Sequence, residues 1–190
     1  MLTLTQIMNR CEWAKDEPNI TYHDKEWGKP QHDDQKLFEF LILEGAQAGL
    51  SWTTILKRRD GYRKAFSDFN ALKVSRYDKK HIEKLLRDES IIRNKLKINS
   101  AINNAKQFLK IQIEFGSFDN YLWGFVNHTP IKNSFKKSSE LPSSTSLSKK
   151  ISLDMKKHGF TFVGPTICYA LMQAVGMVND HTMDCYLFEK

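Results

Sequence analysis

Two cysteines and two histidines near the two ends of the sequence are of the residue types that bind zinc. His181 and Cys185 are four residues apart, so on a helix or turn both side chains lie on the same side. Cys11 and His23 lie near the N-terminus. Two thiolates and two imidazoles form a closed structural zinc set, which here would join the two ends of the chain. The alternative is four unrelated residues, because the spacing is not that of a standard zinc finger, and the spacing alone leaves both possibilities open.

One carboxylate, that of Glu44, has apolar and small neighbours in the sequence, with FEFLIL before it and GAQAGLSW after it. A carboxylate in such surroundings is either paired within the fold or reserved for a ligand. Trp13, Tyr22 and Trp27 lie close together upstream, and Trp52 follows downstream. Aromatic faces with one acidic acceptor suit a flat, electron-poor ligand such as a purine. The alternative is that the tryptophans belong to the core and that Glu44 bridges elements of the fold.

The segment KKHGFTFVGPTICYALMQAVG predicts a helix, a very short turn and a second helix. Gly164 can adopt backbone conformations that other residues avoid, and Pro165 suits the first turn of a helix. The N–H groups at such a helix start point outward and can bind an anion such as a DNA phosphate, with Lys156 and Lys157 just upstream. An ordinary corner between two packed helices has the same pattern, because short helix connections are common.

The elements that must position these residues are predicted to be helices, because apolar residues recur at helical spacing along the chain. We expect helices after Asp33 or Asp34, after Ser51, after Asp78, over Lys95–Phe115, after Asp119 or Asn120, over Leu147–Lys157 and from Pro165 to Gly176. The Pro- and Ser/Thr-rich segment Asn127–Ser148 predicts an exposed connection that packs over a helical body. Cys168 lies in an apolar helical segment and is expected to be a small buried residue. No segment has the alternating pattern of a strand, so the predicted fold class is all-α.

Length and composition limit the class of protein. A chain of 190 residues favours one domain, or two small lobes that share a core. The net charge of +7 favours a polyanionic partner, nucleic acid first. Three cysteines are too few for the disulfide framework of a secreted protein. The N-terminus does not have the pattern of a signal peptide, and no apolar stretch approaches the roughly 20 residues of a membrane span. We therefore expect a cytoplasmic protein without a membrane partner.

Several long blocks of the sequence, taken together, resemble the bacterial 3-methyladenine DNA glycosylase I family. They run in order from about Asn9 to Cys185 and read RCEWAKDEPNITYHDKEWGKP, LFEFLILEGAQAGLSWTTILKRR, IIRNKLKINSAINNAKQF, FVNHTP and KKHGFTFVGPTICYALMQAVGMVNDHTMDC. The resemblance implies an all-α protein of the helix-hairpin-helix DNA glycosylase superfamily, formed by residues 1–190 as a single domain of two helical lobes.

The resemblance also implies roles for individual residues. It implies one structural Zn²⁺ bound by Cys11, His23, His181 and Cys185. It implies a base pocket with Glu44 as the catalytic residue, Tyr22 and Trp52 as base-binding residues, and Trp13, Trp27 and Gln47 as further lining. It implies a hairpin over Phe162–Thr166 in which Val163, Gly164 and Thr166 contact a DNA phosphate.

The activity that the resemblance implies is base-excision repair of alkylated double-stranded DNA by a monomeric, monofunctional enzyme. Hydrolysis of the N-glycosidic bond would release free 3-methyladenine and leave an abasic site. The catalytic aspartate of the superfamily aligns with Asn179, and Asp180 is one position away, which agrees with a branch that works without this aspartate. Phe162 also stands where the superfamily hairpin usually has glycine. Two rival interpretations are a related glycosylase with a different lesion range and a non-catalytic, zinc-stapled DNA-binding module.

Overall fold

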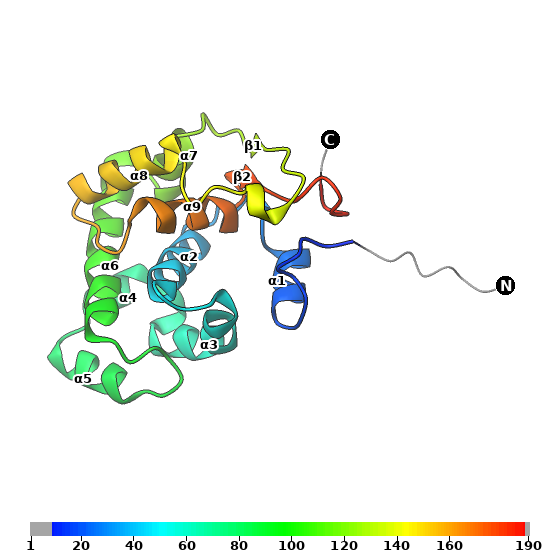
Figure 1. Cartoon of the computed structure of the whole chain (residues 1–190). Coiled ribbons are helices and arrows are strands. Elements are labelled where there is room, and N and C mark those ends of the chain that lie inside the picture. Colours follow the sequence, from blue (N-terminus) through cyan, green and yellow to red (C-terminus); the bar gives the residue numbers. More distant parts are fainter. Residues whose placement is uncertain (1–8, 189–190) are drawn as a thin grey trace.

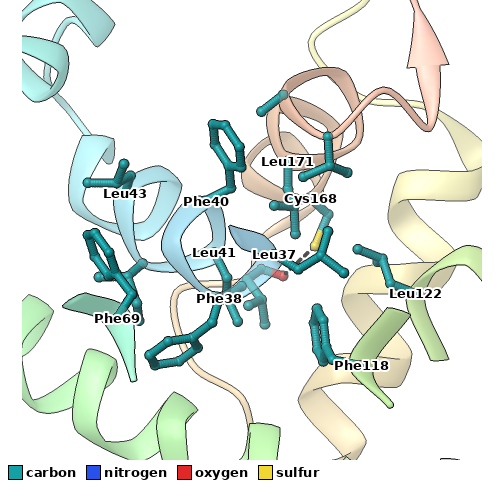
Figure 2. Close-up of a cluster of buried hydrophobic side chains, with 14 of the residues drawn as sticks. Leu37, Phe38, Phe40, Leu41, Leu43, Phe69, Phe118, Leu122, Cys168 and Leu171 are labelled. Atoms are coloured by element: carbon teal, nitrogen blue, oxygen red, sulfur yellow. Dashed lines mark hydrogen bonds between the residues drawn. The ribbon is translucent and has the colours of Figure 1, made fainter. Parts of the chain in front are cut away.

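A single helix, α2 (Asp34–Gln47), runs through the middle of the protein, whose computed structural model describes residues 9–188 (Figure 1). Its residues from Leu37 to Ala46 are buried on every face, as expected for a helix that lies inside the core. Four helices pack against it: α3 (Trp52–Ala65), α6 (Lys95–Phe115), α7 (Phe118–Gly124) and α9 (Pro165–Ala174). Figure 2 shows the centre of this core, where side chains of α2 meet Phe118, Leu122 and Leu171.

Shorter elements complete the helical body. Helix α6 packs against two of them on one side, and α8 packs against α9 on the other. These elements are α4 (Ala71–Ser75), α5 (Lys79–Arg87), α8 (Ser146–Lys157) and the 3-10 turns η1 (Ser67–Phe69) and η2 (Ser138–Glu140). Helix α1 (Asn19–Lys25) lies at one side of this body, next to the N-terminal and C-terminal segments (Figure 1).

Most of the predicted helix starts are confirmed. The side chains of Asp33, Ser51 and Asp78 each accept a hydrogen bond from a backbone N–H in the first turn of α2, α3 and α5. The predicted cap of α7 is wrong, because Ser117, and not Asp119 or Asn120, accepts that bond. Helices α1 and α4 were not predicted, since both are too short to show a helical period.

The all-α prediction is confirmed except for one very short parallel pair of strands. Strand β1 (Ile131–Lys132) pairs with β2 (Val178–Asn179). Two residues are too few to show an alternating pattern, so these strands could not be predicted from the sequence. The pair joins the connection 127–145 to the C-terminal segment, and the N–H of Met183 donates to the carbonyl of Phe135 at 2.9 Å nearby. Within residues 9–188, no helix has the length and apolar character needed to cross a membrane.

Candidate active site and metal-binding cluster

A pocket of about 300 Å³ opens between α1, α2, α3 and α9. This volume is at the lower end of the range for small-molecule pockets, roughly 300–1,000 Å³, and suits a ligand the size of one heterocycle. All six side chains predicted to form a base pocket line it: Trp13, Tyr22, Trp27, Glu44, Gln47 and Trp52. They come from four separate places in the chain. Gly49, with a positive φ of 77°, turns the chain after α2 and brings Trp52 back towards Glu44.

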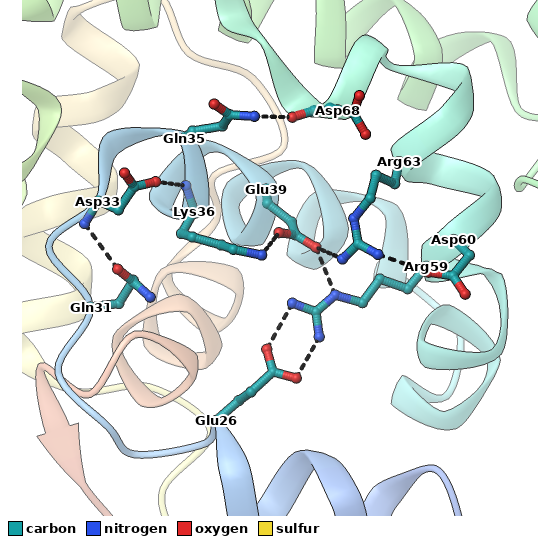
Figure 3. A network of polar contacts seen from close by, with 10 residues as sticks. All are labelled: Glu26, Gln31, Asp33, Gln35, Lys36, Glu39, Arg59, Asp60, Arg63 and Asp68. Carbon is teal, nitrogen blue, oxygen red and sulfur yellow. Dashed lines mark hydrogen bonds and ion pairs between the residues drawn. The ribbon is translucent and has the colours of Figure 1, made fainter.

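Glu44 is the acidic residue among those that line this pocket, and its environment differs sharply from that of Glu39, another acid of the same buried helix. Burial alone would raise the pKa of Glu39, but Lys36 and Arg59 bind its carboxylate and hold its pKa below the ordinary value (Figure 3). Glu44 is only 4% exposed, and its Oε2 has no hydrogen-bond partner within residues 9–188. Burial raises the pKa of Glu44 from 4.5 to about 8. Glu39 is therefore paired within the fold, whereas Glu44 has the environment of a ligand-binding carboxylate.

Aromatic rings form the walls around Glu44. The ring of Tyr22 lies 5.3 Å from that of Trp52 and 6.2 Å from that of Trp13, and Trp13 meets Trp27 edge-on at 5.0 Å. The indole Nε1 of Trp52 is a buried donor without a partner in the described part of the chain. The pocket thus offers flat apolar faces with a buried acceptor and a buried donor that both lack a partner in the described part of the chain, which fits a planar heterocycle that carries both kinds of group.

Five further residues line the pocket and were not predicted from the sequence: Asn19, Thr53, Leu141, Ala170 and Gln173. The side chains of Asn19 and Thr53 hydrogen-bond at 2.9 Å and join α1 to the start of α3. Leu141 comes from the Ser/Thr-rich connection, which packs over the helical body at this residue, in agreement with the prediction for this segment. None of the five belongs to a motif of its own, and only the fold brings them to the pocket.

Three of the four predicted zinc ligands lie together beside the pocket. The ligand atoms of Cys11, His23 and Cys185 are all within 4.8 Å of one another, and the three residues are buried. The Sγ of Cys185 is 3.4 Å from Nε2 of His23. The Nδ1 of His23 is 2.8 Å from Oδ1 of Asp24, a carboxylate that Arg10 also binds. If Nδ1 donates to Asp24, Nε2 keeps its lone pair on the side of the thiols.

His181, the fourth predicted ligand, is buried next to this cluster. Its ring lies 5.0 Å from the ring of His23 and 4.7 Å from that of Trp27. Its Nδ1 is 2.8 Å from the side-chain oxygen of Asn179, whereas no ligand atom of His181 lies within the 4.8 Å group. Gly28 makes this placement possible: its φ is 73°, and a Cβ there would lie 2.7 Å from Cε1 of His181.

Neither Asn179 nor Asp180 is placed as a catalytic acid or base. Asp180 is fully buried and accepts hydrogen bonds from Asn133, Tyr169 and Gln173 at 2.6 to 2.8 Å. Its carboxylate is therefore occupied within the fold. Asn179 contacts His181, as described above, so its side chain positions that imidazole.

The predicted hairpin is a tight connection between α8 and α9. Its backbone is anchored on α6, where the side chain of Asn104 both accepts from the N–H and donates to the carbonyl of Thr161 at 2.9 Å. Two residues of this connection have left-handed backbone: Gly159, with φ of 84°, and Phe162, with φ of 53°. The conformational argument for Gly164 is wrong, since its φ of −63° and ψ of 161° suit any residue. What Gly164 does provide is open space, because a Cβ there would meet nothing within 4 Å.

The start of α9 is uncapped, and Thr166 is exposed there. Val163 has a buried side chain, and its carbonyl accepts from the hydroxyl of Ser152 at 2.6 Å and from the thiol of Cys168. Any contact of Val163 with a ligand would therefore involve its N–H. Cys168 is buried and unbridged, which confirms its prediction as a small core residue.

Comparison with known proteins agrees with this geometry. The family model described as methyladenine glycosylase matches residues 13–189. DNA-3-methyladenine glycosylase 1 of Escherichia coli (strain K12) is 47% identical over 179 residues, which cover 94% of this chain and 96% of that protein. DNA-3-methyladenine glycosylase of Haemophilus influenzae (strain ATCC 51907 / DSM 11121 / KW20 / Rd) is 44% identical over 94% of this chain and 97% of that protein.

Solved structures show the same fold. A crystal structure of a 3-methyladenine DNA glycosylase I superimposes with a TM-score of 0.93 at 42% identity, over 95% of this chain and all of that one. The Staphylococcus aureus 3-methyladenine DNA glycosylase I, whose structure describes 3-methyladenine recognition, gives a TM-score of 0.92 at 35% identity over 96% of this chain and 98% of that one. The chain therefore belongs to the methyladenine glycosylase family.

Proposed function

We propose that this protein is a DNA glycosylase that hydrolyses the N-glycosidic bond of 3-methyladenine in alkylated double-stranded DNA. The observation that carries the proposal is the buried, unpaired carboxylate of Glu44 in an aromatic pocket the size of one purine. The relatives named above, which are similar over nearly their whole length, carry this activity in their names. The products would be free 3-methyladenine and an abasic site.

The chemistry needs little from the protein beyond selection of a cationic base. Methylation at N3 gives adenine a positive charge, so the base leaves as a neutral molecule that carries the electron pair of the broken C1′–N9 bond. Water adds to C1′ and loses a proton, and no acid is needed to protonate the leaving group. The enzyme must first flip the nucleotide out of the duplex, which costs a few kcal/mol and less for a damaged base.

Glu44 and the aromatic rings would then recognise the charge of the flipped base. Stacking on Trp52 and Tyr22 favours a positively charged ring. The carboxylate of Glu44 would accept a hydrogen bond from the exocyclic amine of the base. Burial disfavours the ionised form of Glu44, and the positive charge of the bound base favours it again. A neutral base provides no such charge. The residues that line the described pocket include no lysine, which agrees with a monofunctional enzyme that forms no Schiff base.

We further propose that Cys11, His23, His181 and Cys185 bind one structural Zn²⁺. Zinc bonds of about 2.0–2.3 Å in a tetrahedron place ligand atoms about 3.3–3.8 Å apart, and the Cys185–His23 distance of 3.4 Å fits this range. The contact of His23 with Asp24 supports the proposal, because ligand histidines usually donate their second N–H to a carboxylate or carbonyl. When bound, the ion would join the N-terminal segment, α1 and the C-terminal segment, and a closed set would leave no position for a reactive water.

Binding to undamaged DNA is proposed to use the hairpin between α8 and α9. The uncapped start of α9 and the open surface at Gly164 support contact between a phosphate and the N–H groups of Val163, Gly164 and Thr166. The positive net charge supports binding that does not depend on sequence. We propose that the protein acts as a monomer in the cytoplasm, as one helix-hairpin-helix glycosylase domain.

A base-release assay on methylated DNA tests the function. The wild-type protein should release 3-methyladenine, and Glu44→Gln should lower the rate about tenfold to a hundredfold while affinity for DNA persists. Uracil-containing DNA is the matched neutral-base substrate. A non-catalytic DNA-binding module would bind both DNAs and release no base, and a glycosylase of different range would release another base from the same DNA.

A further inference from the structure

One guanidinium group, that of Arg59, joins the three helices that carry Tyr22, Glu44 and Trp52. Arg59 lies in α3, two turns after Trp52, and its side chain is only 12% exposed. Its Nη1 and Nη2 donate to the two carboxylate oxygens of Glu26, at the end of α1, at 2.7 and 2.8 Å. Its Nε donates to Oε1 of Glu39 in α2 at 2.7 Å (Figure 3). A bidentate pair of this kind fixes direction as well as distance.

These contacts lead directly to Tyr22. The N–H of Glu26 donates to the carbonyl of Tyr22 at 2.9 Å, so both residues belong to the last turn of α1. The guanidinium of Arg59 also lies over the ring of Phe40, 5.3 Å from its centre, and the ring of Phe40 is 6.4 Å from that of Tyr22. Arg59 thus reaches Tyr22 along two separate routes, one through the backbone of α1 and one through a core ring.

Helix α1 depends on such links for its position. It has seven residues and no side-chain cap at its start, and a helix this short does not form alone in water. The Asn19–Thr53 hydrogen bond attaches its first turn to α3, and the Glu26–Arg59 pair attaches its last turn. Tyr22 lies between these two attachments. We infer that Arg59 is a positioning residue that sets the place of Tyr22 in the base pocket by fixing α1 on α2 and α3. This inference rests on the proposed function, since it concerns the same pocket.

Arg59→Lys tests the inference, because lysine keeps the charge but cannot bind both oxygens of Glu26 and Oε1 of Glu39 together. Affinity for free 3-methyladenine, measured by the change in tryptophan fluorescence, should fall about tenfold. Affinity for undamaged DNA should stay unchanged, since the hairpin lies on other helices. Glu26→Gln should reproduce the loss, and the double variant should lose little more than either single variant.

Arg63→Met is the matched control. Arg63 lies in the same helix and donates to the same Oε1 of Glu39 at 3.1 Å, but its other hydrogen bond goes to Asp60 in its own helix and not to Glu26. This variant should lose stability and keep its affinity for the base within about twofold. If Arg59→Lys or Glu26→Gln binds 3-methyladenine with wild-type affinity, the inference is overturned. It is also overturned if all three variants lose affinity for the base in proportion to their loss of stability. A wild-type protein that neither binds 3-methyladenine nor releases it from DNA would instead refute the proposed function.

Discussion

The environment of Glu44 predicts that replacing it with glutamine stabilises the protein while it lowers activity. In the unfolded chain this carboxyl has a pKa of 4.5, and in the folded protein its pKa is about 8. Between these values the folded protein keeps a proton that the unfolded chain releases, so raising the pH favours unfolding. Each pH unit in this interval costs about 1.4 kcal/mol, which amounts to about 3 kcal/mol at pH 7 and up to about 5 kcal/mol above pH 8. Glu44→Gln carries no titrating proton and escapes this cost.

Urea denaturation of both proteins at about pH 5, 7 and 8.5 measures the effect. At pH 5 the free energies of unfolding of the two proteins should differ by little. This small difference measures the effect of the side-chain change apart from its titration. At pH 7 the variant should be more stable by up to about 3 kcal/mol, a midpoint shift of about 1.5 M at a typical urea slope of about 2 kcal/mol/M. The gap should widen further at pH 8.5.

Glu39 provides the opposite control on the same helix. Its partners Lys36 and Arg59 hold its pKa below the ordinary value, so its ionised form stabilises the fold above its unfolded pKa. Glu39→Gln should therefore lose stability at pH 7, where Glu44→Gln gains it. The reasoning is refuted if the free energies of unfolding of the wild type and Glu44→Gln change in parallel from pH 5 to 8.5. Glu44 would then not have a raised pKa.

The other predictions concern the metal, the hairpin and the substrate. Purified protein should contain close to one equivalent of zinc. Cys185→Ala should lower both the zinc content and the melting temperature. Full zinc occupancy in this variant, measured by metal analysis, would contradict the proposed ligand set. Gly164→Val should keep the fold, because a Cβ at this position meets nothing within 4 Å. It should weaken binding to DNA of every sequence alike. Unchanged DNA binding in a filter or anisotropy assay would place the phosphate site elsewhere. The logarithm of DNA affinity should fall with the logarithm of salt concentration, with a slope that grows by about 0.9 for each phosphate contacted. Release of 3-methyladenine should exceed release of uracil by orders of magnitude, and efficient uracil release would show that a positive charge on the base is not required.

The parts of the fold that depend on local signals could be predicted from the sequence. Side-chain caps such as Ser51 act within one helical turn, and the long apolar period of Lys95–Phe115 is visible without any knowledge of its neighbours. Helix α1 has neither a cap nor enough length, and it is positioned by contacts with residues more than 30 positions away. Phe162 adopts a left-handed conformation that its residue type disfavours, because the surrounding helices hold the hairpin in place.

The candidate site divides in the same way. The aromatic cluster and Glu44 stand out in the sequence as unusual residue types for their surroundings, and the structure brings them to one pocket. The sequence alone could not separate Glu44 from Glu39, since both lie in the same apolar run. The difference is the partner Arg59, which comes from another helix. Leu141 and Gln173 reach the pocket from distant segments of ordinary composition, and no local pattern marks them.

The contacts between the two ends of the chain have a consequence for synthesis on the ribosome. The N–H of Tyr186 donates to the carbonyl of Asn9 at 2.9 Å, the side chain of Asn9 donates to Asp184, and Cys185 meets His23. Helix α1 is therefore translated early and can meet α3 once that helix is made, but the N-terminal segment and α1 gain these C-terminal contacts only when residues 184–186 emerge, after the other described helices have been made. A chain that stops before residue 184 would lack these contacts, so joining the two ends is one of the late steps of folding during synthesis.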